Sequence, residues 1–268
     1  MTAFQNWLGA LETRYLADLA FREVSRSVRA LSADYVERRG RITQGRVLSG
    51  AGKRAAFALF YGPLHFLLID RIAEQISDRI ARDPSVARGE RRLLVDLGCG
   101  TGAAGAAWAG RVGLAGSAMP APLALPVPWV LGIDRSAWAL DEASRTYRQF
   151  GLWARTRRAD VVAMALPREP AAFLAAFTMN ELSSAGRDAL LTRVLDRGRR
   201  GDQVLIVEPL AGFVARWWDT WRRAFESAGG RGDEWRFRVE LPPLIRRLDD
   251  AAGLTHDELT GRTLWLGR

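Results

Sequence analysis

The sequence predicts an α/β protein with a mostly parallel sheet, and two observations support this. First, the apolar run Leu93 to Leu97 leads into a turn that carries Gly98, Gly100 and Gly102, and a small-residue segment suited to a helix follows. A buried strand, a glycine turn and a helix, in that order, form the nucleotide site of parallel α/β sheets. Second, short apolar runs and helical patterns alternate along the rest of the chain, as βα units require.

The length and composition limit the number of domains and the class of protein. A chain of 268 residues with 48% hydrophobic residues is long enough for one α/β domain and an accessory segment. Cys99 is the only cysteine, which excludes intrachain disulfides and multi-cysteine metal sites, so no metal is expected. The longest apolar run, Ala55 to Ile69, is interrupted and too short to span a bilayer. With no secretory signal pattern, we expect a cytoplasmic protein without membrane contact, and the oligomeric state stays open.

The formal net charge of +9 comes almost entirely from arginine. Such an excess suits an anionic partner such as RNA or the ribosome. The arginines are spread along the chain instead of forming one dense block, so a merely solvated basic surface is the alternative. The groups are Arg38-Arg39-Arg41, Arg155-Arg157-Arg158, Arg197-Arg199-Arg200 and Arg222-Arg223.

Residues 1–90 are predicted to form a helical cap. Apolar side chains recur at three- and four-residue steps through residues 1–35, and a second helical region, Arg54 to Ala81, is expected to break at Gly62-Pro63. Polar connections occupy Arg38 to Gly52 and Ala81 to Arg91. Since ligands of open α/β sheets bind at the carboxyl ends of the strands, we expect this cap to cover that edge.

Residues 91–268 are predicted to form the sheet domain. The proline-rich stretch Val112 to Trp129 reads as a surface loop, because proline excludes regular helix and central strand. Helices are expected at Ser136–Tyr147, Ala185–Leu195 and Pro242–Ala252. Further strands are expected at Trp129–Ile133, Leu152–Arg157, Phe173–Met179 and Gln203–Val207, with a closing antiparallel hairpin made by Thr255–Thr260 and Arg262–Leu266.

An aromatic-rich insert at about 211–241 interrupts this pattern. It contains Trp217, Trp218, Trp221 and Trp235, and positions 214, 217, 218, 221 and 225 share one helical face. Either a helix buries this face against the body of the protein, or the tryptophans form an aromatic wall that stacks a flat substrate.

The charge beside the glycine turn discriminates between ligands. Gly98 to Ala103 also satisfies the dinucleotide pattern G-x-G-x-x-[G/A], which alone is a weak signal. Asp96 lies two residues before Gly98, where its carboxylate would repel a pyrophosphate but attract the sulfonium and ammonium groups of S-adenosylmethionine. We therefore expect S-adenosylmethionine, with a nicotinamide dehydrogenase or a turn without ligand as the alternatives.

The segment Val-Asp-Leu-Gly-Cys-Gly-Thr-Gly, residues 95–102, resembles the first motif of class I S-adenosylmethionine-dependent methyltransferases. The resemblance implies a Rossmann-like fold with a mostly parallel seven-stranded sheet and a C-terminal antiparallel hairpin. It also implies a cofactor site. Asp96 and the three glycines would hold the methionine end of the cofactor. Asp134 would accept hydrogen bonds from the ribose hydroxyls, unless it only caps the next helix. Asp160 would accept a hydrogen bond from the adenine amino group. Cys99, Thr101, Arg135, Val161 and Asn180 complete the expected cofactor site.

Three further segments resemble a narrower group, the methyltransferase-like proteins linked to assembly of the mitochondrial small ribosomal subunit and their bacterial relatives. These are Asn180-Glu181-Leu182, Glu208-Pro209 and Phe57 to Phe66. Those proteins carry a cysteine cluster after the fifth strand. This chain has none there, which excludes iron–sulfur binding.

A hydroxyl or ammonium acceptor must lose a proton, which is work for a general base. Asn180 and Glu181 lie at the carboxyl end of the fourth strand, and His65 and Tyr61 can reach the same place from the cap, although His65 also suits a structural role. The sequence lacks an Asn/Asp-Pro-Pro-aromatic motif and a second cysteine, which argues against methylation of base amines and of cytosine C5. We therefore expect a methyltransferase acting on a small molecule or RNA. The alternative is a non-catalytic protein that uses the cofactor fold in ribosome or RNA binding.

Overall fold

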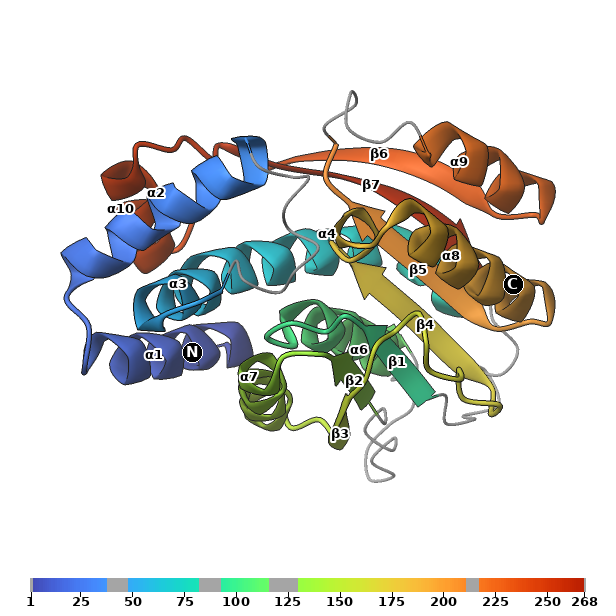
Figure 1. Ribbon diagram of the computed structural model, residues 1–268, viewed down its shortest axis with the longest axis horizontal. Coiled ribbons are helices and arrows are strands. Elements are labelled where there is room, and N and C mark those ends of the chain that lie inside the picture. The colour runs from blue at the N-terminus through green and yellow to red at the C-terminus, as the bar shows by residue number, and fades with distance from the viewer. Residues whose placement is uncertain (1, 38–47, 82–92, 116–129, 211–216, 268) are drawn as a thin grey trace.

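A seven-stranded sheet forms the centre of the computed structural model, which describes residues 2–37, 48–81, 93–115, 130–210 and 217–267 (Figure 1). Its strands are β1 (Leu93–Leu97), β2 (Val130–Asp134), β3 (Ala154–Arg158), β4 (Ala171–Ala176), β5 (Gln203–Glu208), β6 (Arg231–Arg238) and β7 (Glu258–Leu266). They lie in the order β3-β2-β1-β4-β5-β7-β6. Pairing is parallel from β3 to β5, and β7 is antiparallel to both β5 and β6, so the predicted mostly parallel sheet is confirmed.

The central strands are apolar on both faces, as a sheet covered on two sides requires. Every residue of β5 is buried, and alternate residues belong to different cores. On one face lie α6 (Ala103–Ala115), α7 (Ala137–Gln149) and the long helix α4 (Gly62–Ala81), and on the other lie α8 (Ser184–Arg199) and α9 (Trp218–Ser227). The reversal of strand order between β1 and β4 places a ligand site at their carboxyl ends.

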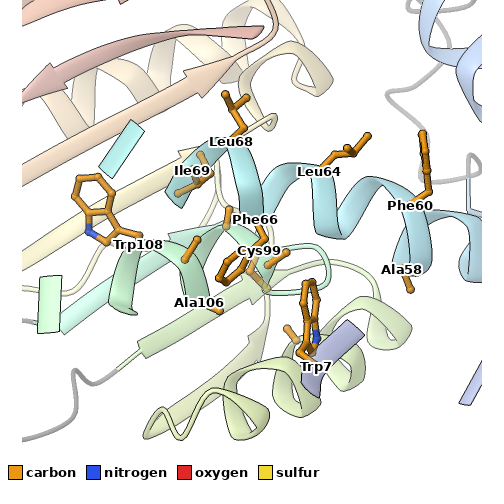
Figure 2. Packing of buried hydrophobic residues seen from close by; sticks show 14 of the residues in the cluster. Trp7, Ala58, Phe60, Leu64, Phe66, Leu68, Ile69, Cys99, Ala106 and Trp108 are labelled. Atoms are coloured by element: carbon orange, nitrogen blue, oxygen red, sulfur yellow. The ribbon is translucent and has the colours of Figure 1, made fainter. Parts of the chain in front are cut away.

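The N-terminal helices pack on the first of these faces. They are α1 (Ala3–Leu16), α2 (Phe21–Glu37) and α3 (Ala51–Ala56), and α2 packs against α10 (Pro243–Ala252). Figure 1 shows α1, α2, α3 and α10 gathered beyond one end of the sheet. In Figure 2, Trp7 of α1 and Phe66 of α4 lie beside the turn that carries Cys99. The buried apolar cluster runs without interruption from α1 through α4 and α6 to β5.

Helix limits differ from the prediction in two places in this region. Residues 1–35 do not form one helix, because α1 ends at Leu16 and α2 begins at Phe21. A new helix, α4, does begin at the expected Gly62-Pro63, but the chain stays helical across this point instead of breaking. A π-helical turn, η2 (Phe57–Tyr61), joins α3 to α4, and the Gly62 N–H donates to the Phe57 carbonyl. The wider turn keeps the chain helical around Pro63, whose ring would clash with a carbonyl in a regular α-helix.

Two strands are displaced from their predicted limits. β3 begins two residues later than expected, and β4 covers Ala171–Ala176 instead of 173–179. Phe177 and Thr178 follow β4, and residues Met179–Glu181 then form a short 3-10 turn, η3, instead of continuing the strand. The loop predicted from Val112 starts too early, because residues 112–115 belong to α6, and Ala81 is the last residue of α4. The rest of the connections predicted at 81–91 and 112–129, and most of that at 38–52, lie outside the described residues.

The predicted C-terminal hairpin is wrong in its pairing. Thr255–Thr260 and Arg262–Leu266 do not face each other, since β7 is a single strand running through Gly261. Its antiparallel partner is β6, inside the aromatic-rich insert, and α10 separates the two in sequence. A Cβ at Gly261 would lie 3.1 Å from Leu68 Cδ2. Glycine is therefore present because α4 approaches the strand closely, and not because the chain turns there.

The helical stretch Ala51–Ile76 has a mean hydropathy of 1.3, which makes it long and apolar enough to span a bilayer by length and composition. The sequence prediction that this region is too short was based on the break at Gly62-Pro63. However, 67% of the apolar window is buried inside the protein. Most of this stretch therefore packs inside the α/β domain.

Candidate functional site

The glycine turn between β1 and α6 is anchored on the neighbouring strand. The N–H groups of Gly98 and Cys99 donate to the Ile133 carbonyl at 2.8 and 2.9 Å. Gly98, Gly100 and Gly102 all have positive φ, a conformation that L side chains rarely adopt. At Gly100 an added Cβ would meet only the Phe57 ring, at 3.7 Å, so the turn presents bare backbone toward the cap.

Asp96 lies behind this turn and not on its open side. It is 1% exposed, and its carboxylate accepts hydrogen bonds from the Tyr147 hydroxyl, at 2.8 Å, and from the Gly105 N–H in the first turn of α6. Burial raises the pKa of Asp96 to about 7. The positive end of α6 is thus already occupied by a side-chain carboxylate, which leaves a pyrophosphate less favourable binding there.

Asp134 connects the turn to the second strand. Its Oδ2 accepts from the Gly100 N–H at 3.1 Å and its Oδ1 from the Ser136 N–H at 2.8 Å. The N-cap of α7 is Ser136 itself, whose side chain accepts from the Ala139 N–H. Each carboxylate oxygen retains a second acceptor position for a ligand hydroxyl.

Arg135 and Asp160 meet at the carboxyl ends of β2 and β3. Arg135 Nη1 lies 3.6 Å from Asp160 Oδ2, and Asp160 Oδ1 accepts from the Val162 N–H at 2.8 Å. Val161 is buried against the sheet. The structure therefore places the predicted ribose and adenine residues on adjacent strand ends.

Glu181, in the turn after β4, faces the same place. Its surface is open to solvent, yet the protein around it raises its pKa to about 7, with the charge of Asp134 as the second cause. Glu181 and Asp134 thus make the approach to the glycine turn acidic.

An aromatic group covers the site from the cap side. Phe57, Tyr61 and His65 follow one another at four-residue steps through η2 and α4. The His65 ring stacks on Phe177 at 4.0 Å between centroids, and Phe57 contacts it edge-on at 5.9 Å. Phe177 directly follows β4 and has a φ of 59°, a strained conformation for a side chain of this size.

The cap residues predicted to act as bases are poorly suited to that task. Burial lowers the pKa of His65 to about 3, so the imidazole is neutral and weakly basic near pH 7. Burial raises the pKa of Tyr61 to about 12, and its hydroxyl hydrogen-bonds to Ser32 of α2. Both side chains shape the site more than they activate an acceptor.

Asn180 forms part of a buried polar chain. Its Nδ2 donates to Glu208 Oε2 at 2.6 Å, and its Oδ1 accepts from Trp217 Nε1 at 3.1 Å. The Met179 N–H donates to the other oxygen of Glu208 at 2.6 Å. Glu208 is fully buried, and burial raises its pKa to about 8.

The predicted wall of four tryptophans does not form. Trp218 and Phe225 bury one face of α9, as the packing interpretation of this helix predicted, and Trp217 and Trp221 pack beside them on the same core. Trp235 lies in β6, stacks on Phe237 at 5.8 Å and packs on the opposite core. Val214 lies outside the described residues.

The arginine groups are only partly available to a partner. Arg197 is held inside by Asp202 and by the carbonyls of Pro167 and Glu169. Arg222 pairs with Glu226 at 3.1 Å. Arg155, Arg157 and Arg158 are exposed along the edge strand β3, and Arg38–Arg41 lie outside the described residues.

Sequence reasoning missed several residues that build the site. Tyr147 and Phe177 contact their partners only through the tertiary fold, and nothing in the residue type signals a phenylalanine with positive φ. The buried role of Glu208 had one signal, its position at the predicted end of a buried strand. Arg262 gave none, since it lay in a segment predicted as a hairpin.

No protein-family model matches the chain, and no curated protein matches its sequence. Solved structures do match. The mitomycin 7-O-methyltransferase MmcR is 13% identical with a TM-score of 0.51, and the match covers 97% of this chain and 72% of that one. An O-methyltransferase family protein from Burkholderia thailandensis is 12% identical with a TM-score of 0.50, covering 91% and 71% of the two chains. The chain therefore has the Rossmann-like fold of the class I methyltransferases.

Proposed function

We propose that this protein is a methyltransferase that uses S-adenosylmethionine. The observation that carries the proposal is the distribution of acids around the glycine turn. Asp96 occupies the N-terminus of α6 from behind, while Asp134 and Glu181 face the approach to the turn. This arrangement favours a cationic nucleoside over a pyrophosphate, because opposite charges attract and the helix end is already satisfied.

The residues present fit this cofactor. Bare backbone at Gly100 leaves room for close approach, and Asp134 retains acceptor positions for the two ribose hydroxyls. Asp160 and Val161 follow β3, beside the end of β2, and we expect the adenine to extend toward them. S-adenosylmethionine supplies an electrophilic methyl group with a neutral sulfide as the leaving group.

The chain's own residues then orient the acceptor and manage its proton. His65 contacts Phe57 edge-on and stacks on Phe177, and these three rings cover the site from the cap side. Glu181 is the best-matched base among the predicted candidates, since a pKa of about 7 suits proton transfer at neutral pH. Alignment of the acceptor with the methyl group supplies much of the rate enhancement. The acceptor is a small molecule or RNA, and the location is the cytoplasm.

Calorimetric titration tests the proposal. S-adenosylmethionine and its demethylated product, S-adenosylhomocysteine, are expected to bind with micromolar affinity, and NAD is not. Asp134→Asn is expected to weaken binding of the demethylated product by at least tenfold, because the amide loses one acceptor oxygen. Asp141→Asn, on an exposed face of α7, is the matched control and leaves binding unchanged. Binding of NAD alone, or no binding at millimolar cofactor, refutes the proposal.

RNA or ribosome binding without catalysis is the second candidate. The exposed arginines of edge strand β3 favour it, although such charges also protect an edge from pairing with another chain. Titration with structured ribosomal RNA at several salt concentrations distinguishes the two. Binding that weakens steeply with salt supports an RNA role, whereas no binding at low salt removes it.

A further inference from the structure

Trp153, the residue before edge strand β3, exposes a large aromatic ring. It is 63% exposed, and no other large apolar side chain among the described residues is exposed to this degree. Its backbone is fixed by the sheet, because its carbonyl accepts from the Val130 N–H at 2.9 Å. Single exposed apolar residues are common on protein surfaces, so the neighbours of Trp153 decide whether the ring has a role.

Two arginines project beside this ring on the same face of the sheet. Successive side chains of a strand point to opposite faces, so Trp153, Arg155 and Arg157 share one face. The other face of β3 packs on α7, where Thr156 Oγ1 lies 3.1 Å from Ser144 Oγ. Both arginines are exposed. We call Trp153, Arg155 and Arg157 the β3 strip.

The helices on the strip's side of the sheet pack at the other end of the strand order. Leu131, the register partner of Arg155, packs on the same core as α8 and α9. On that side, α8 packs on β5 and β7, and α9 packs on β6 and β7. Figure 1 shows β3 at the opposite end of the sheet from α9. The β3 strip therefore forms a surface that a partner can reach along the edge of the sheet.

The chain around the strip is strongly basic. Residues 143–159, which run from α7 through β3, contain five arginines and no acidic residue, against a net charge of +9 for the whole chain. All five are exposed. They are Arg145, Arg148, Arg155, Arg157 and Arg158. This concentration of one sign of charge attracts a polyanion.

Protection of the sheet edge explains the arginines but not the tryptophan. Charged side chains on an edge strand prevent pairing with another chain, whereas an exposed aromatic ring beside them favours association. A second copy of this chain is a poor partner, because pairing of two β3 edges would bring like charges together. An acidic polypeptide would satisfy the arginines alone. A single-stranded nucleic acid satisfies both features, with phosphates for the guanidinium groups and a base for the ring.

We propose that the β3 strip binds a single-stranded segment of RNA, with one base stacked on Trp153 and phosphates on Arg155 and Arg157. RNA is the partner because its loops and ends expose unstacked bases. Side chains two residues apart on a strand are spaced by roughly 6.6 Å, so the three groups contact an extended strand in succession. β3 ends beside Asp134, which pairs in register with Arg158, so the bound RNA runs toward the candidate cofactor site. Binding requires neither cofactor nor catalysis, and the surface stands apart from the proposed methyltransferase function.

Fluorescence anisotropy with a labelled oligouridylate about 12 nucleotides long tests this surface. We expect the single strand to bind about tenfold more tightly than a blunt RNA duplex of the same length, because paired bases cannot stack on the ring. Trp153→Ala is expected to weaken binding at least fivefold, and Trp153→Phe to keep most of it, because phenylalanine retains a ring for stacking.

The salt dependence tests the two arginines of the strip. Each phosphate contact on a single strand contributes about 0.7 to the slope of log K against log salt, so Arg155→Gln/Arg157→Gln is expected to lower that slope by about 1.4. Arg222→Gln/Arg223→Gln removes the same charge from exposed positions on α9 and is the matched control, with an unchanged slope.

Four results would overturn the proposal. They are no binding at low salt, equal binding of single strand and duplex, unchanged binding by Trp153→Ala, and equal loss of slope in the two double variants. Tighter binding of oligodeoxythymidylate assigns the strip to DNA, and equally effective competition by polyglutamate assigns it to acidic polypeptides, so either also overturns it. The same samples are titrated with S-adenosylhomocysteine. RNA binding without cofactor binding would therefore refute the methyltransferase and keep the β3 strip.

Discussion

Asp96→Asn tests whether the carboxyl group behind the glycine turn stabilises the fold in its ionised form or in its protonated form. The substitution keeps the shape of the side chain and removes its charge. The Tyr147 hydroxyl can rotate to accept from an amide as readily as it donates to a carboxylate. The variant therefore isolates the cost of burying the negative charge.

The magnitude follows from the shift of the Asp96 pKa from 3.8 to about 7. A folded-state pKa above the unfolded value means that the folded protein holds the proton more tightly. Stability from this group is thus complete below about pH 4 and is lost as the pH rises to about 7. The loss over this window is about 4 kcal/mol, at 1.36 kcal/mol for each pKa unit. The amide of the variant has no proton to lose, so the variant escapes this loss.

Urea unfolding of the wild type and Asp96→Asn at several pH values between 4 and 8 measures the difference directly. We expect near equality at pH 4 and an advantage of several kcal/mol for the variant at pH 8. Other titrating groups cancel in the comparison, and Asp141→Asn controls for loss of an exposed carboxylate. A pH-independent difference, or a variant less stable at pH 8 than at pH 4 relative to wild type, refutes the reasoning.

Two backbone predictions follow from positive φ angles. Gly102→Ala is expected to cost about 2–4 kcal/mol in urea unfolding, because φ is 76° and the new Cβ would lie 2.9 Å from Ala143 Cα. Gly110→Ala, in the following helix α6 with nothing within 4 Å, instead gains about 0.5–1 kcal/mol, and equal effects at the two sites would contradict this. Phe177→Ala and Phe177→Gly both lose the ring stacked on His65, yet the glycine variant is expected to be about 1 kcal/mol more stable, since φ is 59°. The usual order, with alanine more stable, would show that this backbone is unstrained.

Features that arise from local sequence were predictable in this fold. The strand, glycine turn and helix around Gly98 appear as expected, and α10 ends at Gly253 with a φ of 70°. Strand β6 was not predictable by the same means. Its sequence, Arg-Gly-Asp-Glu-Trp-Arg-Phe-Arg, has no apolar run, because an edge strand covered on one face needs few apolar side chains. Its pairing with β7 also depends on contacts far apart in sequence.

The candidate site, like the fold, has residues that the sequence predicts and others that it does not. The residues of the turn and Asp134 follow from the order of strand ends, a property of the fold class. The partners that determine their chemistry do not, since Tyr147 reaches Asp96 from 51 residues away and the Asp134 charge reaches Glu181 across the strand ends. Sequence reasoning predicted which acid stands beside the turn, but assigned it direct attraction to the cofactor. The structure puts Asp96 behind the backbone and Asp134 and Glu181 in front.

This arrangement separates two roles that one carboxylate cannot fill. An acid that satisfies the first turn of α6 must be buried, and burial raises its pKa and weakens its charge. An acid that attracts a sulfonium must keep its charge and face the ligand. In the proposed function Asp134 would fill this second role, since the backbone N–H groups of Gly100 and Ser136 hold its two carboxylate oxygens beside the turn. Selectivity for a cation at this turn therefore depends on the second strand at least as much as on the glycine motif itself.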